Sequence, residues 1–226
     1  TGFRFNNAGS KLNIRTITNW GTLRLGNSNS YFYGCQNLTL TTVAGTLDLT
    51  GTTSFFQMFS GCSALTTVNG INSWNTAAVN DMSGMFMKTS DFNNECKNWK
   101  TEKVTTMNSM FKNAEGYNQH KLASWDYSGI SNSEEGLYLY ISNTGMTPTT
   151  YSNYITELSN NTKISNKNIG NTGCVRLYNK SVNAAINIIR GTKQITIIDG
   201  GGFTERQLNI ETSDPNRVIL MTNENS

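Results

Sequence analysis

A segment of about 27 residues recurs along this chain, and the recurrence restricts the fold more than any other feature of the sequence. Successive copies are marked by Phe32, Phe59, Phe86 and Phe111, at spacings of 27, 27 and 25 residues. Repeats of 20–50 residues indicate a solenoid, in which each copy forms one coil and the stacked coils share a continuous core. The register runs from about residue 17 to about residue 128.

The repeat predicts five columns of buried side chains, with one residue from each coil in each column. The columns are Tyr31, Met58, Met85, Met110; Phe32, Phe59, Phe86, Phe111; Leu38, Leu65, Phe92, Tyr117; Ile17, Ala44, Ile71, Cys96, Leu122; and Trp20, Leu47, Trp74, Trp99, Trp125. Within a coil, the apolar spacing over 79–86 and 104–111 predicts a short helix of about two turns. The polar stretch before each Trp predicts a short strand and turn.

The C-terminal third of the sequence predicts a cap on the open end of the stack. Thr147 and Pro148 are typical of a helix start. A second helix is expected from an N-cap at Ser181, with Gly191 just past its end. Apolar strands over 174–178 and 195–198 flank it, which gives a strand–helix–strand unit, and repeat arrays need such caps.

Several segments resemble the repeat of the BspA-like leucine-rich-repeat surface proteins. They are 81–86 (DMSGMF), 92–93 (FN), 117–119 (YNQ) and 124–126 (SWD), with an entry segment over 17–38, an exit segment over 142–151 and a closing strand over 195–201. The likeness covers roughly residues 10 to 202, and it departs from the family pattern at 94–96 and 120–121. It implies a cell-surface protein of bacteria, mycoplasmas or protists with a role in adhesion and host recognition.

The expected architecture is therefore an α/β repeat solenoid of leucine-rich-repeat-like coils, each a short strand plus a short helix, closed by the strand–helix–strand cap. We expect residues 1–140 to form the solenoid with its entry segment and residues 141–202 to form the cap. Residues 203–226 would be a C-terminal extension, and they match nothing in the resemblance.

Charge and hydropathy exclude several classes of partner. Charged residues make up only 15% of the chain and the formal net charge is +3, without any run of Lys and Arg. We therefore expect neither nucleic-acid binding nor attraction to anionic membranes. No apolar stretch approaches the roughly 18 residues that span a bilayer. Because the sequence opens at Thr1 without a leader, we expect a processed chain or excised domain whose export signal or anchor lies elsewhere.

The cysteines fit no metal-binding spacing. Cys35 and Cys62 share a small-residue column with Thr89 and Ala114, and this favours free, buried thiols. A Cys35–Cys62 bridge between adjacent coils stays open. Cys96 falls in the Ile and Leu column, and Cys174 is expected in the core as the first residue of a strand.

The search for catalytic chemistry finds no motif of a known enzyme class. We expect His120 to be a solvated loop side chain, Asp81 a helix-start residue and Glu134–Glu135 an exposed turn. The other carboxylates considered for glycosidase pairs are Asp91, Glu95 and Asp126. The glycines at 200–202 follow a strand without opening a helix, so a phosphate cradle is not expected. Catalytic, metal and cofactor sites are therefore expected to be absent, and no ligand-binding residue is assigned.

The sequence predicts that some aromatic side chains are buried and others lie on the surface. The Trp column and Tyr117 are expected to be buried, since each occupies a regular position beside an aliphatic column. The expected surface aromatics are Tyr31, Tyr33, Tyr138 and Tyr140, although the alternation over 137–140 equally fits a strand.

The sequence favours an extracellular or cell-surface binding and adhesion module that recognises a protein or glycan on a host or prey cell. One alternative is the receptor-binding tip of a fibre, from a phage or a predatory bacterium, in which the chain would form a homo-oligomer. A second alternative is a structural spacer that binds nothing. We expect no insertion of this segment into a membrane.

Overall fold

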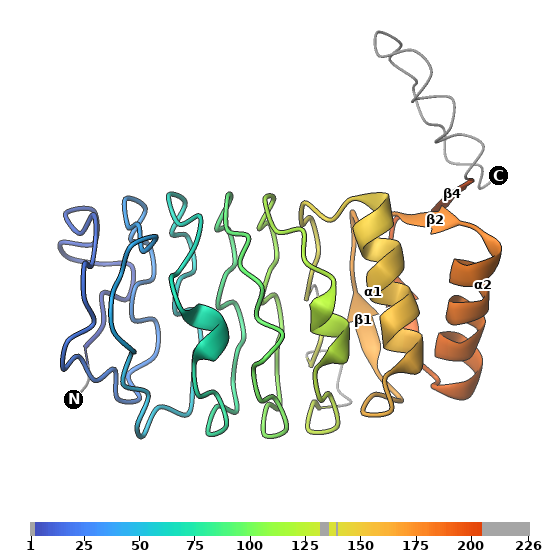
Figure 1. Ribbon diagram of the computed structural model, residues 1–226, viewed down its shortest axis with the longest axis horizontal. Helices are drawn as coiled ribbons and strands as arrows, with labels where there is room; N and C mark the ends of the chain where they lie inside the picture. Colours follow the sequence, from blue (N-terminus) through green and yellow to red (C-terminus); the bar gives the residue numbers. More distant parts are fainter. Residues whose placement is uncertain (1–2, 132–135, 139, 205–226) are drawn as a thin grey trace, which may run out of the picture.

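The computed structural model describes residues 3–131, 136–138 and 140–204, and they form a row of stacked coils (Figure 1). The N-terminal coil lies at one end of the row, and helices α1 (Pro148–Asn160) and α2 (Lys180–Asn187) lie at the other. Successive coils run parallel to one another, as the bridges Ser54–Asp81 and Asp81–Thr106 show. Each coil therefore packs chiefly against the coils before and after it.

Stacked aromatic rings fill the interior. The ring centroids of Phe32 and Phe59, Phe59 and Phe86, and Phe86 and Phe111 lie 5.5, 5.8 and 5.4 Å apart, with interplanar angles of 7, 16 and 12°. All of these rings are fully buried. Offset or near-parallel pairs at this distance are attractive beyond the burial of their area. The spacing of the Phe residues in the sequence thus corresponds to a continuous column in space.

The Trp column is tied to the neighbouring aliphatic column by hydrogen bonds between coils. Trp99 Nε1 donates to the carbonyl oxygen of Ile71 at 2.8 Å, and Trp125 Nε1 donates to that of Cys96 at 3.0 Å. Trp20, Trp74, Trp99 and Trp125 are all buried, as their sequence positions predicted. A buried indole N–H needs a partner, and the offset between the two columns supplies one to Trp99 and Trp125, whereas Trp20 Nε1 in the first coil is buried without a partner among the described residues.

The predicted two-turn helices at 79–86 and 104–111 are absent, and a ladder of tight turns occupies these positions. We call the segments 30–34, 55–61, 82–88 and 107–113 the turn ladder. The N–H groups of alternate residues donate to the next coil, for example Gln57 to Ser83 O at 2.9 Å and Phe59 to Met85 O at 2.9 Å. These N–H groups are therefore not available for bonds within a helix.

Left-handed residues explain why the helix prediction was wrong. In the turn ladder every fourth residue has a positive φ; these residues are Ser30, Gly34, Gln57, Gly61, Gly84, Lys88, Ser109 and Asn113. A right-handed helix cannot pass through such a residue. The spacing of three between buried residues, which indicated a helix, comes instead from consecutive turns.

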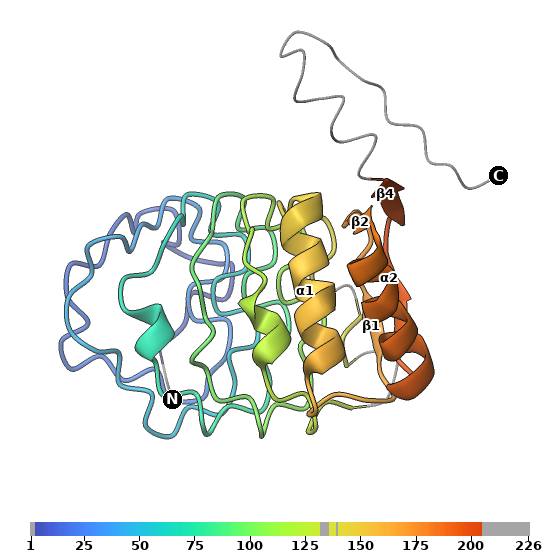
Figure 2. The ribbon, with the colours of Figure 1, turned by 45° about the vertical axis from the view of Figure 1, so that its right-hand side comes forward.

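The predicted strand before the Trp residues is reduced to isolated bridges at Thr16 and Asn19 before Trp20, and two later copies contain short 3₁₀ turns instead. These are η1 (Ile71–Ser73) and η2 (Lys121–Ser124), which precede Trp74 and Trp125. With three residues per turn, a 3₁₀ helix places residues i and i+3 on one side. Ile71 and Trp74 can therefore both point inward. Figures 1 and 2 show η1, η2 and α1 following one another along one face, which we call the helical face.

Helix α1 begins as predicted: the Thr147 side chain accepts a hydrogen bond from Thr150 N, and Pro148 is the first helical residue. Helix α2 begins earlier than predicted, because Asn179, not Ser181, is the N-cap and accepts from Val182 N at 2.9 Å. Gly191 does not follow the helix end. It lies inside a π-helical turn, η3 (Ile188–Thr192), which continues α2.

The strands of the cap are short and pair differently from a single strand–helix–strand unit. Strand β1 (Asn168–Gly170) pairs in parallel with β3 (Thr196–Ile198), and β2 (Arg176–Tyr178) pairs in parallel with β4 (Gly202–Thr204). The two strands that flank α2 thus belong to different sheets. The cap continues the coil pattern, since Asn143 N donates to Thr172 O and Asn171 N donates to Ile198 O.

Candidate binding face

One residue of each coil, in the turn ladder or at the same register beside it, is not fully buried, and we call this set the outer column. Each member lies three residues before a member of the buried Phe position; the members are Asn29, Phe56, Ser83, Asn108 and Tyr138. Successive members are in register, because the residue that follows each one donates its N–H to the carbonyl oxygen of the next, as Ser109 does to Tyr138 at 2.8 Å. Phe56 and Tyr138 are 36% and 52% exposed.

A groove of about 390 Å³ crosses the turn ladder at its centre. It is lined by Phe56, Gln57, Ser83, Gly84, Met87, Thr106, Asn108 and Ser109. The polar groups at its edge contact one another: Ser83 Oγ and Thr106 Oγ1 lie 2.9 Å apart, and Ser109 Oγ donates to Asn108 Oδ1 at 2.7 Å. The groove therefore joins one exposed ring to a set of amides and hydroxyls.

Gly84 shapes the middle of this groove. Its φ of +61° is left-handed, and a Cβ atom there would lie 3.3 Å from Gln57 Cγ. The equivalent positions in the coils on either side carry side chains, Gln57 and Ser109, at φ of 51 and 55°. The glycine is therefore the reason that the groove continues across three coils instead of being closed in the centre.

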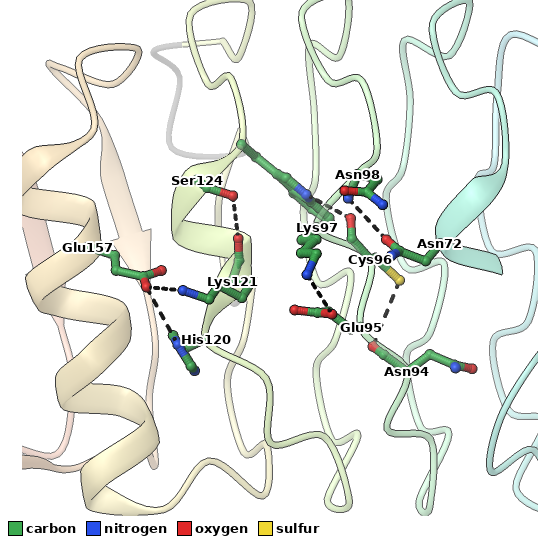
Figure 3. Close-up of polar contacts among 11 residues, drawn as sticks. Asn72, Asn94, Glu95, Cys96, Lys97, Asn98, His120, Lys121, Ser124 and Glu157 are labelled. Carbon is green, nitrogen blue, oxygen red and sulfur yellow. Dashed lines mark hydrogen bonds and ion pairs between the residues drawn. The ribbon is translucent and has the colours of Figure 1, made fainter. Parts of the chain in front are cut away.

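A second polar site lies on the helical face, where η2 meets α1 (Figure 3). Glu157 of α1 accepts from Lys121 Nζ at 2.5 Å, and His120 Nε2 lies 3.5 Å from the same carboxylate oxygen. His120 lies in a loop and its side chain is 30% exposed, and nothing in the sequence indicated its contact with Glu157. The only hydroxyl drawn nearby, on Ser124, donates to the carbonyl oxygen of Lys121. This cluster connects the coils to α1 and offers no activated nucleophile.

Three of the carboxylates weighed as glycosidase residues, Asp81, Asp126 and Glu95, contact groups of their own coil. Asp81 Oδ1 accepts from Ser83 N at 2.8 Å and caps a turn, not the helix start that was expected. Asp126 Oδ1 accepts from Ser128 N at 2.8 Å. Glu95 lies 3.4 Å from Lys97, and Asp91 is exposed.

Glu134 and Glu135 lie outside the described residues, as does most of the expected extension at 203–226. Among the residues that are described, no group of three or more His, Cys, Asp or Glu side chains could hold a metal ion. Along the same ranges, no helix is both long and apolar enough to cross a bilayer.

The four cysteines are free and buried. Burial raises the pKa of the Cys35 thiol to about 12. Cys62 Sγ instead donates to the carbonyl oxygen of Phe32, so the bridge that the sequence left open is not formed. Thiols with raised pKa values carry little thiolate at neutral pH and are poor nucleophiles or metal ligands.

Two of the four expected surface aromatics are in the core. Tyr31 is fully buried and donates to the carbonyl oxygen of Gly26 at 2.9 Å, and Tyr140 is fully buried as well. Tyr33 is half-buried, Tyr138 is exposed and Tyr117 is buried. The exposed ring of Phe56 was missed. Its signal in the sequence was its position three residues before Phe59, because the equivalent positions in other copies carry the polar residues Asn29, Ser83 and Asn108.

The residues that line the groove lie in the part of the chain that matches a family model. The family model described as "Mycoplasma protein of unknown function, DUF285" matches residues 3–125. The chain belongs to the DUF285 family. Searches of curated proteins and of solved structures found no match. The match to DUF285 covers the coils from the entry segment to Trp125, including every residue that lines the groove.

Proposed function

We propose that this DUF285 chain is a non-catalytic binding and adhesion module of the BspA-like, leucine-rich-repeat surface type. It works outside the cell or at the cell surface and recognises a protein or glycan on a host or prey cell. The observation that carries the proposal is the contrast between the inner and outer positions of the turn ladder. Inner positions repeat the same apolar residues, whereas the outer column changes chemistry from coil to coil.

That contrast favours a scaffold that presents a recognition surface. The inner residues Met58, Met85 and Met110 are equivalent in three coils and are all fully buried. The outer residues of the same coils are Phe56, Ser83 and Asn108, which are aromatic, hydroxyl and amide. A spacer needs only the inner pattern. Ser83 Oγ contacts Thr106 Oγ1 of the next coil, but among the described residues the ring of Phe56 and the side chain of Asn108 form no hydrogen bond or ring contact between coils. Solenoid proteins use such extended faces for binding.

The polar groups on the rest of the described surface support binding better than catalysis. The histidine is held in an ion-pair cluster between η2 and α1, and the cysteines are buried. A catalytic group needs a partner within hydrogen-bond reach and a cleft that contains both. The groove on the turn ladder contains amides, hydroxyls and apolar groups, which bind ligands without transferring a proton at neutral pH.

The test is retention of whole cells by the immobilised chain, with panels of bacterial and animal cells offered in suspension. We expect at least one cell type to be retained. The triple variant Phe56→Ser, Asn108→Ser, Tyr138→Ser should lose this retention, because it places Ser at four consecutive positions of the outer column.

The matched control changes exposed residues of the helical face, Lys97→Ser, Asn98→Ser and Asn160→Ser, and it should retain the same cells. If no cell type in the panel is retained by the unmodified chain, the spacer is the better description and the proposal fails. If the helical-face variant loses retention and the outer-column variant keeps it, binding is real but on another face.

A further inference from the structure

The geometry points to a binding site for an uncharged oligosaccharide in the groove of the turn ladder, with the Phe56 ring as the platform on which a sugar ring stacks. This inference rests on the proposed function and narrows it. A module that recognises a cell-surface protein or glycan becomes one that recognises a neutral glycan at a stated place. Four observations carry it.

The first observation is the absence of charge in the groove. None of the side chains that line it is ionisable. Three other hollows described in the structure each include charged groups: Lys121 and Glu157 in one, Asp48 and Lys103 in another, Arg176 and Asp199 in the third. An acidic glycan, a phosphate or a charged peptide would leave its charge unpaired in the turn-ladder groove, at a large desolvation cost. Neutral ligands are favoured.

The second observation is the pairing of an apolar ring with amides and hydroxyls. A pyranose ring has apolar C–H faces and a rim of hydroxyl groups that both donate and accept. Phe56, which is 36% exposed, supplies an apolar surface, and Met87 is the other large apolar side chain of the lining. The side chains of Gln57 and Asn108 use their carbonyl oxygens as acceptors for Ser30 and Ser109. Their amide nitrogens have no partner among the described residues and can donate to sugar hydroxyls.

The third observation concerns the floor of the groove and argues against a peptide. Extended peptides bind by adding a strand to an open sheet edge, with hydrogen bonds between main chains. Here the N–H groups of Gln57, Gly84 and Ser109 already donate to Ser83, Asn108 and Tyr138 of the next coil, at 2.9, 2.8 and 2.8 Å. The backbone that a peptide strand would need is therefore already used. Recognition must come from side chains, which is the usual situation for sugars.

The fourth observation is size. The volume of about 390 Å³ lies within the range of about 300–1,000 Å³ that is typical of small-ligand sites. The groove crosses three coils, and with about 4.8 Å between hydrogen-bonded neighbours its length along the stack is about 10 Å. That length accommodates a short oligosaccharide because Gly84 leaves the centre open.

The purified chain is titrated with short linear oligosaccharides of glucose, N-acetylglucosamine, galactose and mannose. Binding is measured by calorimetry and by changes in NMR chemical shifts. We expect one neutral series to bind and to shift resonances of the groove. Phe56→Ala should weaken binding by about tenfold, since the sugar would lose its apolar platform. Gln57→Ala should weaken it by roughly two- to tenfold through the loss of one donor.

Gly84→Asn provides a second, independent variant, since asparagine tolerates a left-handed backbone and its side chain would fill the groove. We expect this variant to fold and to bind no oligosaccharide. The matched control is Tyr178→Ala, which removes a 55% exposed ring from β2, far along the chain from the groove, and should bind as the unmodified chain does. Thermal unfolding of each variant reports whether it is folded.

Three results would overturn the inference: no binding by any neutral series, equal or tighter binding of sialylated or sulfated oligosaccharides, or shifts in the groove with an uncharged peptide and not with sugars. The outcome is separable from that of the proposed function. If cells are retained but neutral sugars do not bind, the inference fails and the adhesion proposal stands. If the groove binds neutral sugars but no cell is retained, the site stands and the adhesion proposal fails.

Discussion

Replacing Phe86 with alanine tests the idea that the stacked rings hold the coils together. Phe86 is fully buried, and its ring centroid lies 5.8 Å from Phe59, 5.4 Å from Phe111 and 4.0 Å from Phe92. Truncation of a buried Phe typically costs about 3–5 kcal/mol, because apolar contacts are lost and a cavity remains. Since domains are stable by only about 5–15 kcal/mol, the change removes a large share of the stability.

The assay is urea unfolding of the purified chain, followed by both tryptophan fluorescence and circular dichroism. With a slope of about 2–3 kcal/mol per molar urea, the Phe86→Ala midpoint should fall by about 1–2.5 M. The control is Phe56→Ala, the same chemical change at a half-exposed ring, for which we expect a loss below about 1 kcal/mol. Equal losses in the two variants, or a loss below about 1 kcal/mol for Phe86→Ala, would refute the reasoning.

Two further outcomes follow from buried polar groups. Trp99→Phe removes the indole N–H that donates to the carbonyl oxygen of Ile71 and leaves that oxygen with Trp74 N as its donor, so we expect it to lower the free energy of unfolding by about 0.5–1.5 kcal/mol in the same urea assay; an unchanged midpoint would mean that the bond between columns contributes nothing. Burial raises the pKa of several tyrosines well above the usual value of 10.0, namely Tyr117, Tyr127, Tyr140, Tyr151 and Tyr154. Because the unfolded chain releases these protons near pH 10 while the folded chain retains them, the tyrosines should add a fall in stability above that pH to the fall that the buried cysteines, whose pKa values are also raised, begin near pH 9; tyrosinate absorbance that rises before unfolding would contradict this.

The column assignments followed from spacing alone, because a residue that repeats at a fixed position must meet its counterparts in a stack. Phe32, Phe59 and Phe86 were placed in one interior by this argument, and their rings are stacked. The outer column, three residues before each Phe, could have been identified from the same spacing. It was missed because its residues, such as Phe56 and Asn108, are chemically unlike and share only the property that none is fully buried.

Local structure was harder to predict than the register. A spacing of three between buried residues is shared by a helix and by consecutive tight turns, and only backbone angles separate the two. Gln57, Lys88 and Ser109 have a positive φ, which cannot be predicted from these residue types as it can from glycine. The cap shows the same limit, since α1 had a clear Thr-Pro start, while the partners of β2 and β3 depend on contacts distant in sequence.

The donation of alternate N–H groups from each coil to the next has a mechanical consequence. The first and last described segments lie at opposite ends of the row, so tension between them acts along the direction in which coils separate (Figure 1). The bonds between two coils would break together, and the row would open from an end, one coil at a time. Each detached coil would exchange about 5 Å of height for about 90 Å of extended polypeptide. A tether of this construction would lengthen in steps under a pulling force before its hold at the far end is lost.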